Sequence, residues 1–246
     1  MNADLERAHA LLLSGEIEDA LALLALVEDD AARRLRAGLL ARCERPIEAL
    51  ADLDRLSNPT LEDALLRVRV LNTLGQAEAA LALLRALHAE QPNDPRLAEL
   101  MYDQHRTMGR MAEAAALAEA YSTDWRWRHR LAETLADMGR AQDALAHYEQ
   151  VLALLKARHG AGIPTHLVSV YVSALVGAAS AAVDCGQYTR ARALLTQAAA
   201  HSDDPAIAYY DALARRGLND PNAEAALESA LAQCSPALRA AFSSNH

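Results

Sequence analysis

The sequence predicts an all-α, right-handed superhelical solenoid of about seven antiparallel helix-turn-helix repeats. One short phrase, a turn residue followed five residues later by alanine, recurs along the 246 residues. Apolar residues on both sides of each turn are spaced three and four apart, as on one face of a helix. The chain is 52% hydrophobic but only 4% aromatic, and its apolar residues are mainly the helix formers Ala and Leu. Repetition with a period near thirty is typical of stacked repeats.

The repeated phrase gives the turns in chain order. It occurs at Gly15–Ala20, Glu44–Ala49, Gly75–Ala80, Gly109–Ala114, Gly139–Ala144 and Gly186–Ala191, with a frayed copy at Gly217–Ala226. Glycine suits the turn because it adopts positive φ at a helix end without a steric penalty. Alanine suits the next helix because close packing leaves no room for a larger side chain. Between repeats, proline with Ser, Asn or Asp, as at 57–59 and 202–205, predicts a helix end and a new N-cap.

One interval between turns is longer than the others, with 47 residues from Gly139 to Gly186. We expect the second helix of this repeat to continue through Lys156 and Arg158, and the next first helix to cover 167–183. We expect a single domain over residues 1–246, with sub-blocks 1–158 and 166–246 joined by a loop at 159–165.

Three segments carry a resemblance to a known family. Leu74–Leu81 followed by Pro92, Met138–Leu145 and Cys185–Ala191 each combine the turn glycine with an early alanine in the second helix. They resemble tetratricopeptide repeats, a family with a helix-turn-helix unit of about 34 residues. The resemblance covers almost the whole chain, and the long interval is similar to the longer repeats of kinesin light chains and related bacterial proteins. Several units are short here, and Leu and Ala replace most of the family's aromatic residues.

The resemblance implies that the first helices of the repeats line a groove that binds a peptide or protein segment. The groove positions lie thirteen, ten, six and three residues before each turn, a helical spacing. The candidate partner-binding residues are Arg34, Arg69, Asn72, Arg96, Asp103, Arg106, Trp125, Arg126, Trp127 and His129. Arginine favours carboxylates, which suggests a partner with acidic residues. The alternative is a solvated face with local ion pairs, such as Arg96 with Glu99.

The family's clamp for chaperone C-termini uses lysine and asparagine in its groove. Here Arg34, Gly38 and Leu66 occupy most of the corresponding positions, so the resemblance does not extend to that clamp. The two tryptophans, Trp125 and Trp127, point to roughly opposite sides of a helix. At most one of them belongs in a central core, and the other is a candidate binding anchor.

The sixth repeat has an uncharged groove stripe, formed by Ser173, Val176, Ser180 and Val183. Val176 and Val183 are candidates for an apolar interface. Three alternatives remain for what covers this stripe. They are a partner helix, a homodimer contact, and the chain's own C-terminus with Ala237, Leu238 and Phe242. The uncharged segment 167–183 approaches the length of a membrane span. Its serines and Gly177 favour a buried helix, so we expect no membrane insertion.

Composition and motifs narrow the function. The net charge of −9 argues against a nucleic-acid partner. The three cysteines lack CxxC spacing, the histidines lack metal-ligand spacing, and no HExxH, P-loop, GxGxxG or GxSxG motif is present. We therefore expect no enzyme activity, metal or cofactor, and a cytoplasmic location. The predicted function is a non-catalytic scaffold, adaptor or chaperone-like module. Alternatives are a self-associating scaffold through the 167–183 helix and a sensor of a short peptide or small molecule.

Overall fold

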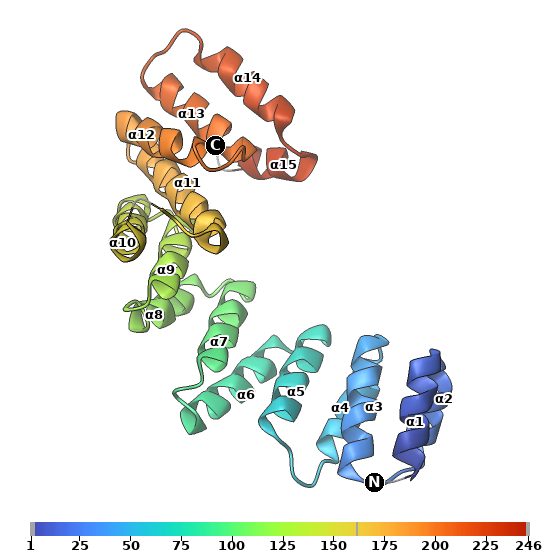
Figure 1. The fold of residues 1–246 in the computed structure, drawn as a ribbon. Helices are drawn as coiled ribbons and strands as arrows, with labels where there is room; N and C mark the ends of the chain where they lie inside the picture. The colour runs from blue at the N-terminus through green and yellow to red at the C-terminus, as the bar shows by residue number, and fades with distance from the viewer. Residues whose placement is uncertain (1–2, 161, 245–246) are drawn as a thin grey trace. The chain divides into compact units, whose positions relative to one another are not determined.

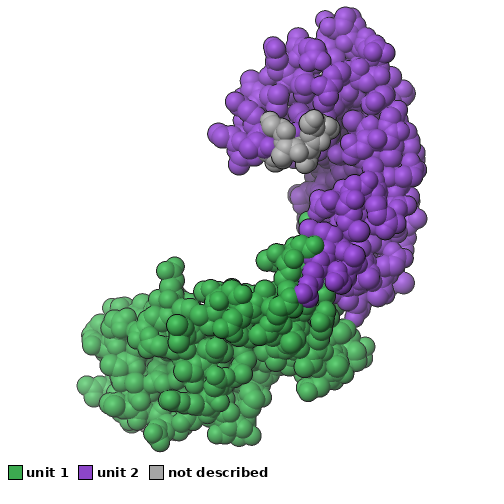
Figure 2. All heavy atoms as spheres, turned by 180° about the vertical axis from the view of Figure 1, so that it is seen from behind, with its two compact units in different colours: residues 1–109 green, residues 110–246 purple. Residues whose placement is uncertain are grey.

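The structure, a computed structural model, describes residues 3–160 and 162–244. The chain forms two compact units, residues 1–109 and residues 110–246 (Figure 2). Each unit is a series of helices joined by short turns (Figure 1). The all-helical repeat architecture predicted from the sequence is confirmed. That the chain forms one domain stays a prediction.

The first unit consists of three helical hairpins and one further helix. Within it, each helix packs against the next along the chain, and α3 also contacts α5. The helices are α1 (Ala3–Ser14), α2 (Ile17–Ala25), α3 (Asp30–Arg42), α4 (Pro46–Asp54), α5 (Leu61–Thr73), α6 (Ala77–Glu90) and α7 (Pro95–Thr107).

The second unit begins with a single helix and continues with three hairpins and a last short helix. Its helices are α8 (Met111–Ala120), α9 (Trp125–Asp137), α10 (Ala141–His159), α11 (Val168–Asp184), α12 (Tyr188–Ala199), α13 (Pro205–Gly217), α14 (Ala223–Gln233) and α15 (Pro236–Ser244), with a 3₁₀ turn, η1 (Thr165–Leu167), before α11. Consecutive helices from α8 to α14 pack against each other, including α10 and α11 on either side of that turn.

The repeated phrase has the structural role that the sequence suggested. The alanines of its six regular copies are all fully buried near the start of the helix that follows each turn. Their turn residues all have positive φ, including Glu44, the one member that is not glycine. Aspartate or threonine caps the first helix of several hairpins, as Asp29 does for α3 by accepting a hydrogen bond from the Ala32 amide at 2.7 Å.

The last turn differs from the expectation. Asn219, not Gly217, has positive φ there, and Gly217 ends α13 in an ordinary helical conformation. A Cβ on Gly217 would lie 2.3 Å from the ring of Tyr188, so this glycine serves close packing. The register of the last repeat is therefore shifted by two residues relative to the prediction.

The long interval forms the two long helices that the sequence predicted. α10 continues to His159 and α11 begins at Val168, although Ala161 in the expected loop 159–165 lies outside the described residues. By length and composition alone, the segment Thr165–Asp184 is long and apolar enough to cross a membrane. In the structure α11 packs against α10, α12 and α13, which accounts for the lack of charge on its buried faces.

Candidate functional site

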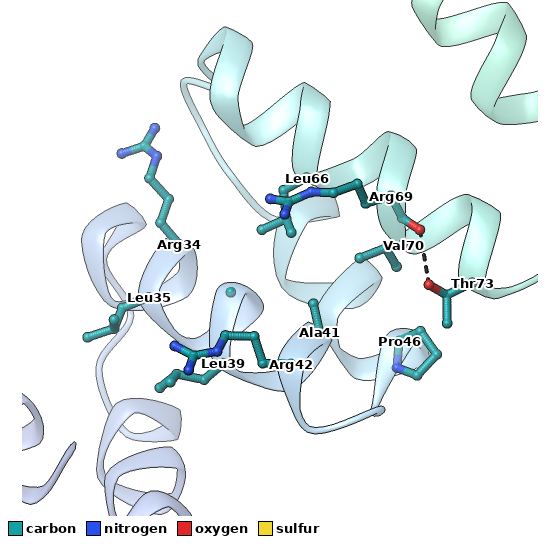
Figure 3. A pocket seen from close by; sticks show the side chains of 11 residues that line it. Arg34, Leu35, Leu39, Ala41, Arg42, Pro46, Leu66, Arg69, Val70 and Thr73 are labelled. Carbon is teal, nitrogen blue, oxygen red and sulfur yellow. Dashed lines mark hydrogen bonds between the residues drawn. The ribbon is translucent and has the colours of Figure 1, made fainter. Parts of the chain in front are cut away.

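A hollow of about 510 Å³ lies between α3 and α5 in the first unit. Its apolar wall comes from Leu35, Leu39, Ala41, Pro46, Leu66 and Val70. Three arginines stand around it: Arg34 and Arg42 on α3, and Arg69 on α5 (Figure 3). Carboxylates are absent from the lining residues, which are all within the part of the chain that the structure describes. The hollow thus combines an apolar surface with three positive charges.

Gly38 helps to form the hollow. It lies inside α3, at a position where most residues would project a side chain into the hollow. A Cβ on Gly38 would meet no atom within 4 Å. The space opposite α5 is therefore open because this position has no side chain.

Arg34 is fixed in place by the start of α5. Its Nε donates to Asp63 Oδ2 at 2.8 Å, and one terminal nitrogen donates to the Asn58 carbonyl at 2.5 Å. Asp63 also accepts from the amide and hydroxyl of Thr60, which completes a capping box at the first turn of α5. Burial by itself would raise the pKa of Asp63, but the hydrogen bonds from Thr60 and Arg34 outweigh it, and the pKa lies below its usual value. This ion pair joins the two helices that flank the hollow.

Arg42 and Arg69 are in a different state. Both side chains are exposed, and neither guanidinium has a hydrogen bond or an ion pair with another described residue. Arg69 contributes only its backbone carbonyl, which accepts from Thr73 Oγ1 (Figure 3). Two guanidinium groups beside an apolar hollow can therefore bind a carboxylate without breaking an existing ion pair.

The other predicted residues of the first unit lie outside the hollow. Asn72 donates to Gln104 Oε1 at 2.7 Å and links α5 to α7. Arg96 donates to Glu62 at 2.8 Å and to Asp94 at 2.9 Å, so carboxylates of the chain itself already hold it. Arg106 lies over the ring of Tyr102, 5.9 Å from the ring centroid, and Asp103 is exposed on α7. Of the predicted set in this unit, only Arg34 and Arg69 come together.

The four predicted partner-binding residues of the second unit separate into core and surface. Trp127 is buried and stacks on Tyr121 with 5.0 Å between ring centroids. Trp125 is partly exposed, and the guanidinium of the exposed Arg126 lies 5.1 Å from its ring centroid. One tryptophan is thus a core residue and the other remains a candidate anchor, as the spacing of two residues suggested.

His129 is mostly buried, and its ring meets Tyr148 edge to face at 5.6 Å. Its Nδ1 lies 3.6 Å from Glu133 Oε1, and its buried Nε2 has no hydrogen-bond partner among the residues that the structure describes. Burial lowers the pKa of His129, and the Glu133 carboxylate opposes that shift only in part. The imidazole is therefore a packed, neutral group more than a contact for acidic partners.

The two apolar candidates on α11 have different surroundings. Val176 is partly exposed, whereas Val183 packs against a cluster that contains Tyr209, Leu213 and Phe242. Leu238 and Phe242, two of the three residues expected to form a terminal cap, belong to this cluster, while Ala237 is exposed.

Sequence reasoning missed Arg42, which lies two residues before the turn residue Glu44 and outside the four counted groove positions. The signal that could have found it is the absence of an acidic residue three or four positions earlier on its own helix, where Leu39 and Gly38 stand. Among the described residues, no three His, Cys, Asp or Glu side chains gather in a group that could hold a metal ion.

No family model matches the sequence, and no curated protein matches it either. Solved structures do match the fold. The C-terminal part of a TPR repeat-containing protein from Cytophaga hutchinsonii is 12% identical, with a TM-score of 0.68 over 92% of this chain and 92% of that one. A crystal structure of MamA is 14% identical, with a TM-score of 0.54 over 67% of this chain and 92% of that one.

A further similar structure is MamA, from residue 41 to the end, of Desulfovibrio magneticus RS-1. It is 17% identical and has a TM-score of 0.50 over 66% of this chain and 99% of that one. At these identities the comparisons establish the fold. They confirm the tetratricopeptide-type solenoid that the turn phrases indicated.

Proposed function

Because this chain has the tetratricopeptide-repeat solenoid fold, we propose that it is a non-catalytic adaptor that binds an acidic segment of another protein between α3 and α5. The observation that carries the proposal is the pair of unpartnered guanidinium groups, Arg42 and Arg69, beside an apolar hollow. An extended segment that carries a carboxylate next to an apolar side chain matches this surface. The carboxylate would accept from the two arginines, and the apolar side chain would enter the hollow over Gly38.

Electrostatics support an acidic partner at this place in spite of the net charge of −9. The chain's overall charge repels acidic proteins at long range, so binding needs a local region of opposite sign. The arginines around the hollow supply that region. A charge-assisted hydrogen bond contributes about 1.5–3 kcal/mol, so the loss of one arginine contact weakens binding by about tenfold or more.

Self-association through the 167–183 helix has less support. The buried faces of α11 pack against α10, α12 and α13, and Val183 at its end packs on the C-terminal cluster. We further propose a cytoplasmic location, in keeping with three free cysteines at positions 43, 185 and 234.

Fluorescence anisotropy with a defined probe tests the proposal. The probe is a fluorescein-labelled nine-residue peptide of Asp, Glu and Leu, and its control has Asn and Gln in place of the acids. The double variant Arg42→Glu, Arg69→Glu should weaken binding of the acidic peptide by about a hundredfold, by the arithmetic of two lost contacts. Gly38→Leu should also weaken it, because the new side chain fills the hollow and leaves both arginines in place.

A matched variant controls for net charge. Arg85→Glu with Arg158→Glu changes the charge by the same amount at two exposed arginines outside the hollow. This variant should bind the acidic peptide like the wild type, apart from a small long-range effect that salt suppresses. Equal losses in the two double variants would show a general charge effect, and the proposed site would be wrong.

A further inference from the structure

The last repeat has buried residues where every other repeat has open ones. Counted from Asn219, the residue with positive φ, the central groove positions of α13 are Tyr209 and Leu213. Both are 4% exposed. At the corresponding positions of α3, α5, α7, α9 and α11, all residues are exposed or partly exposed. Something specific to the last repeat therefore covers its groove face.

The covering element is α15. Phe242, the single phenylalanine of the chain, stacks on Tyr209 with 3.8 Å between ring centroids and 3° between ring planes. Its edge meets Tyr210 at 5.8 Å, and the Tyr209 hydroxyl donates to the Phe242 carbonyl at 3.4 Å. Leu238, one helical turn earlier, packs against the same cluster. The helix thus covers the apolar face of α13 with residues i and i+4, which is how a bound amphipathic helix is recognised.

The uncharged stripe at the counted groove positions continues on α11 beyond the part that α15 covers. Val183 of α11 packs against the same cluster, and the preceding groove positions of α11 are Ser180, Val176 and Ser173. These three are exposed or partly exposed, and none is charged. α15 has nine residues, a length of about 14 Å, so a longer helix would cover both the α13 patch and this open stripe.

We propose that the groove face of α11 and α13 is a binding site for an amphipathic helix of another protein, and that α15 occupies part of it as an internal ligand. The partner helix carries an aromatic residue four positions after a leucine, and its apolar face extends past the length of α15. It displaces α15 and binds more surface than α15 does. This site lies in the second unit and shares no residue with the arginine-lined hollow, so the two proposals stand or fall separately.

Competition within the chain sets the size of the effect. α15 is joined to α14 by the short connection at Cys234 and Ser235, so its effective concentration at the groove is in the millimolar range. A free helix must compete with it and binds more weakly than it would to an empty groove. Weakening the hold of α15 should therefore tighten binding of a free helix by about tenfold or more.

The test uses the full chain and a fluorescein-labelled peptide of residues 235–246 as the stand-in for the partner helix. The Phe242→Ala chain should bind this peptide at least tenfold more tightly than the wild-type chain. A peptide that itself carries Phe242→Ala should bind neither chain. Ala240→Ser, an exposed position on the same helix, is the matched control and should behave like the wild type. Equal affinity of the wild-type and Phe242→Ala chains for the peptide would overturn the proposal.

Hydrogen exchange on the wild-type chain gives an independent result that does not depend on a variant's folding. An excess of the peptide should speed amide exchange in α15 and leave α13 protected, because the free helix replaces α15 in the groove. Unchanged exchange in α15 at peptide concentrations that saturate binding would place the peptide elsewhere and contradict the proposal. If light scattering shows that the wild-type chain is a dimer, the exchange of the α15 amides is measured again after dilution to the monomer. Amides that stay protected support a groove filled within one chain. Loss of that protection would assign α15 to the groove of a second copy and overturn the proposal.

Discussion

Replacing Gly177 by alanine should destabilise the second unit, although the same change at Gly38 should stabilise the first. Both glycines lie inside helices, where alanine is favoured by about 1 kcal/mol. At Gly38 a new Cβ meets open space. At Gly177 it would lie 2.5 Å from Cζ of Tyr148, whose side chain is only 5% exposed and cannot swing into solvent.

Overpacking of this kind costs about 1–3 kcal/mol. The expected change in the free energy of unfolding is therefore a gain of about 1 kcal/mol for Gly38→Ala and a loss of up to about 2 kcal/mol for Gly177→Ala. Urea unfolding followed by tryptophan fluorescence measures the second variant, because both tryptophans lie on α9, which packs against α10 and its Tyr148. Peptide-resolved hydrogen exchange of α3 measures the first.

A double-mutant cycle makes the reasoning refutable. Tyr148→Leu should cost less stability in the Gly177→Ala background than in the wild type, because removing the ring relieves the contact. The expected coupling is at least about 1 kcal/mol. Additive effects, or a stabilising Gly177→Ala, would show that the Tyr148 ring does not need the space left by the absent side chain of Gly177.

Three further outcomes are expected. The stability of the second unit should fall as the pH is lowered from 7.5 to 5.5. Burial keeps the pKa of His129 in the folded state below its value in the unfolded chain, so stability is lost as the pH falls below about 6.5. His129→Phe should reduce the dependence of the unfolding free energy on pH, measured by urea unfolding at several pH values. Asp52→Ala should lower the free energy of unfolding of the first unit by about 3 kcal/mol, since Arg36 donates two hydrogen bonds to this 2% exposed carboxylate, and a second change, Arg36→Met, should restore part of the loss in thermal unfolding. Glu44→Gly should raise the same free energy by about 0.5–1 kcal/mol because Glu44 has a φ of 58°, and hydrogen exchange at the α3–α4 turn would show it as slower opening.

The regular part of the fold could be predicted because its causes are local. A buried alanine at each second-helix start and a positive-φ residue at each turn recur with every copy of the phrase, so periodicity alone locates the hairpins. The long helices α10 and α11 followed from uncharged and helical patterns within one interval. The sequence predicts only part of the arginine-lined hollow, because whether an arginine is free of ion pairs depends on carboxylates from other helices. Arg34 and Arg96 are held by such carboxylates, while Arg69 is not.

The last repeat shows why the remaining part could not be predicted. Glycine has two uses, a turn with positive φ and a close approach of another group, and the sequence does not distinguish them. The repeated phrase predicts Gly217 in the turn, but this glycine makes room for Tyr188, and Asn219 forms the turn instead. With the register set from Asn219, Tyr209 becomes a groove residue, and its partner Phe242 lies 33 residues further along the chain. No helical period connects two such residues, so a repeat pattern can indicate where a groove runs but not which segment of the same chain fills it.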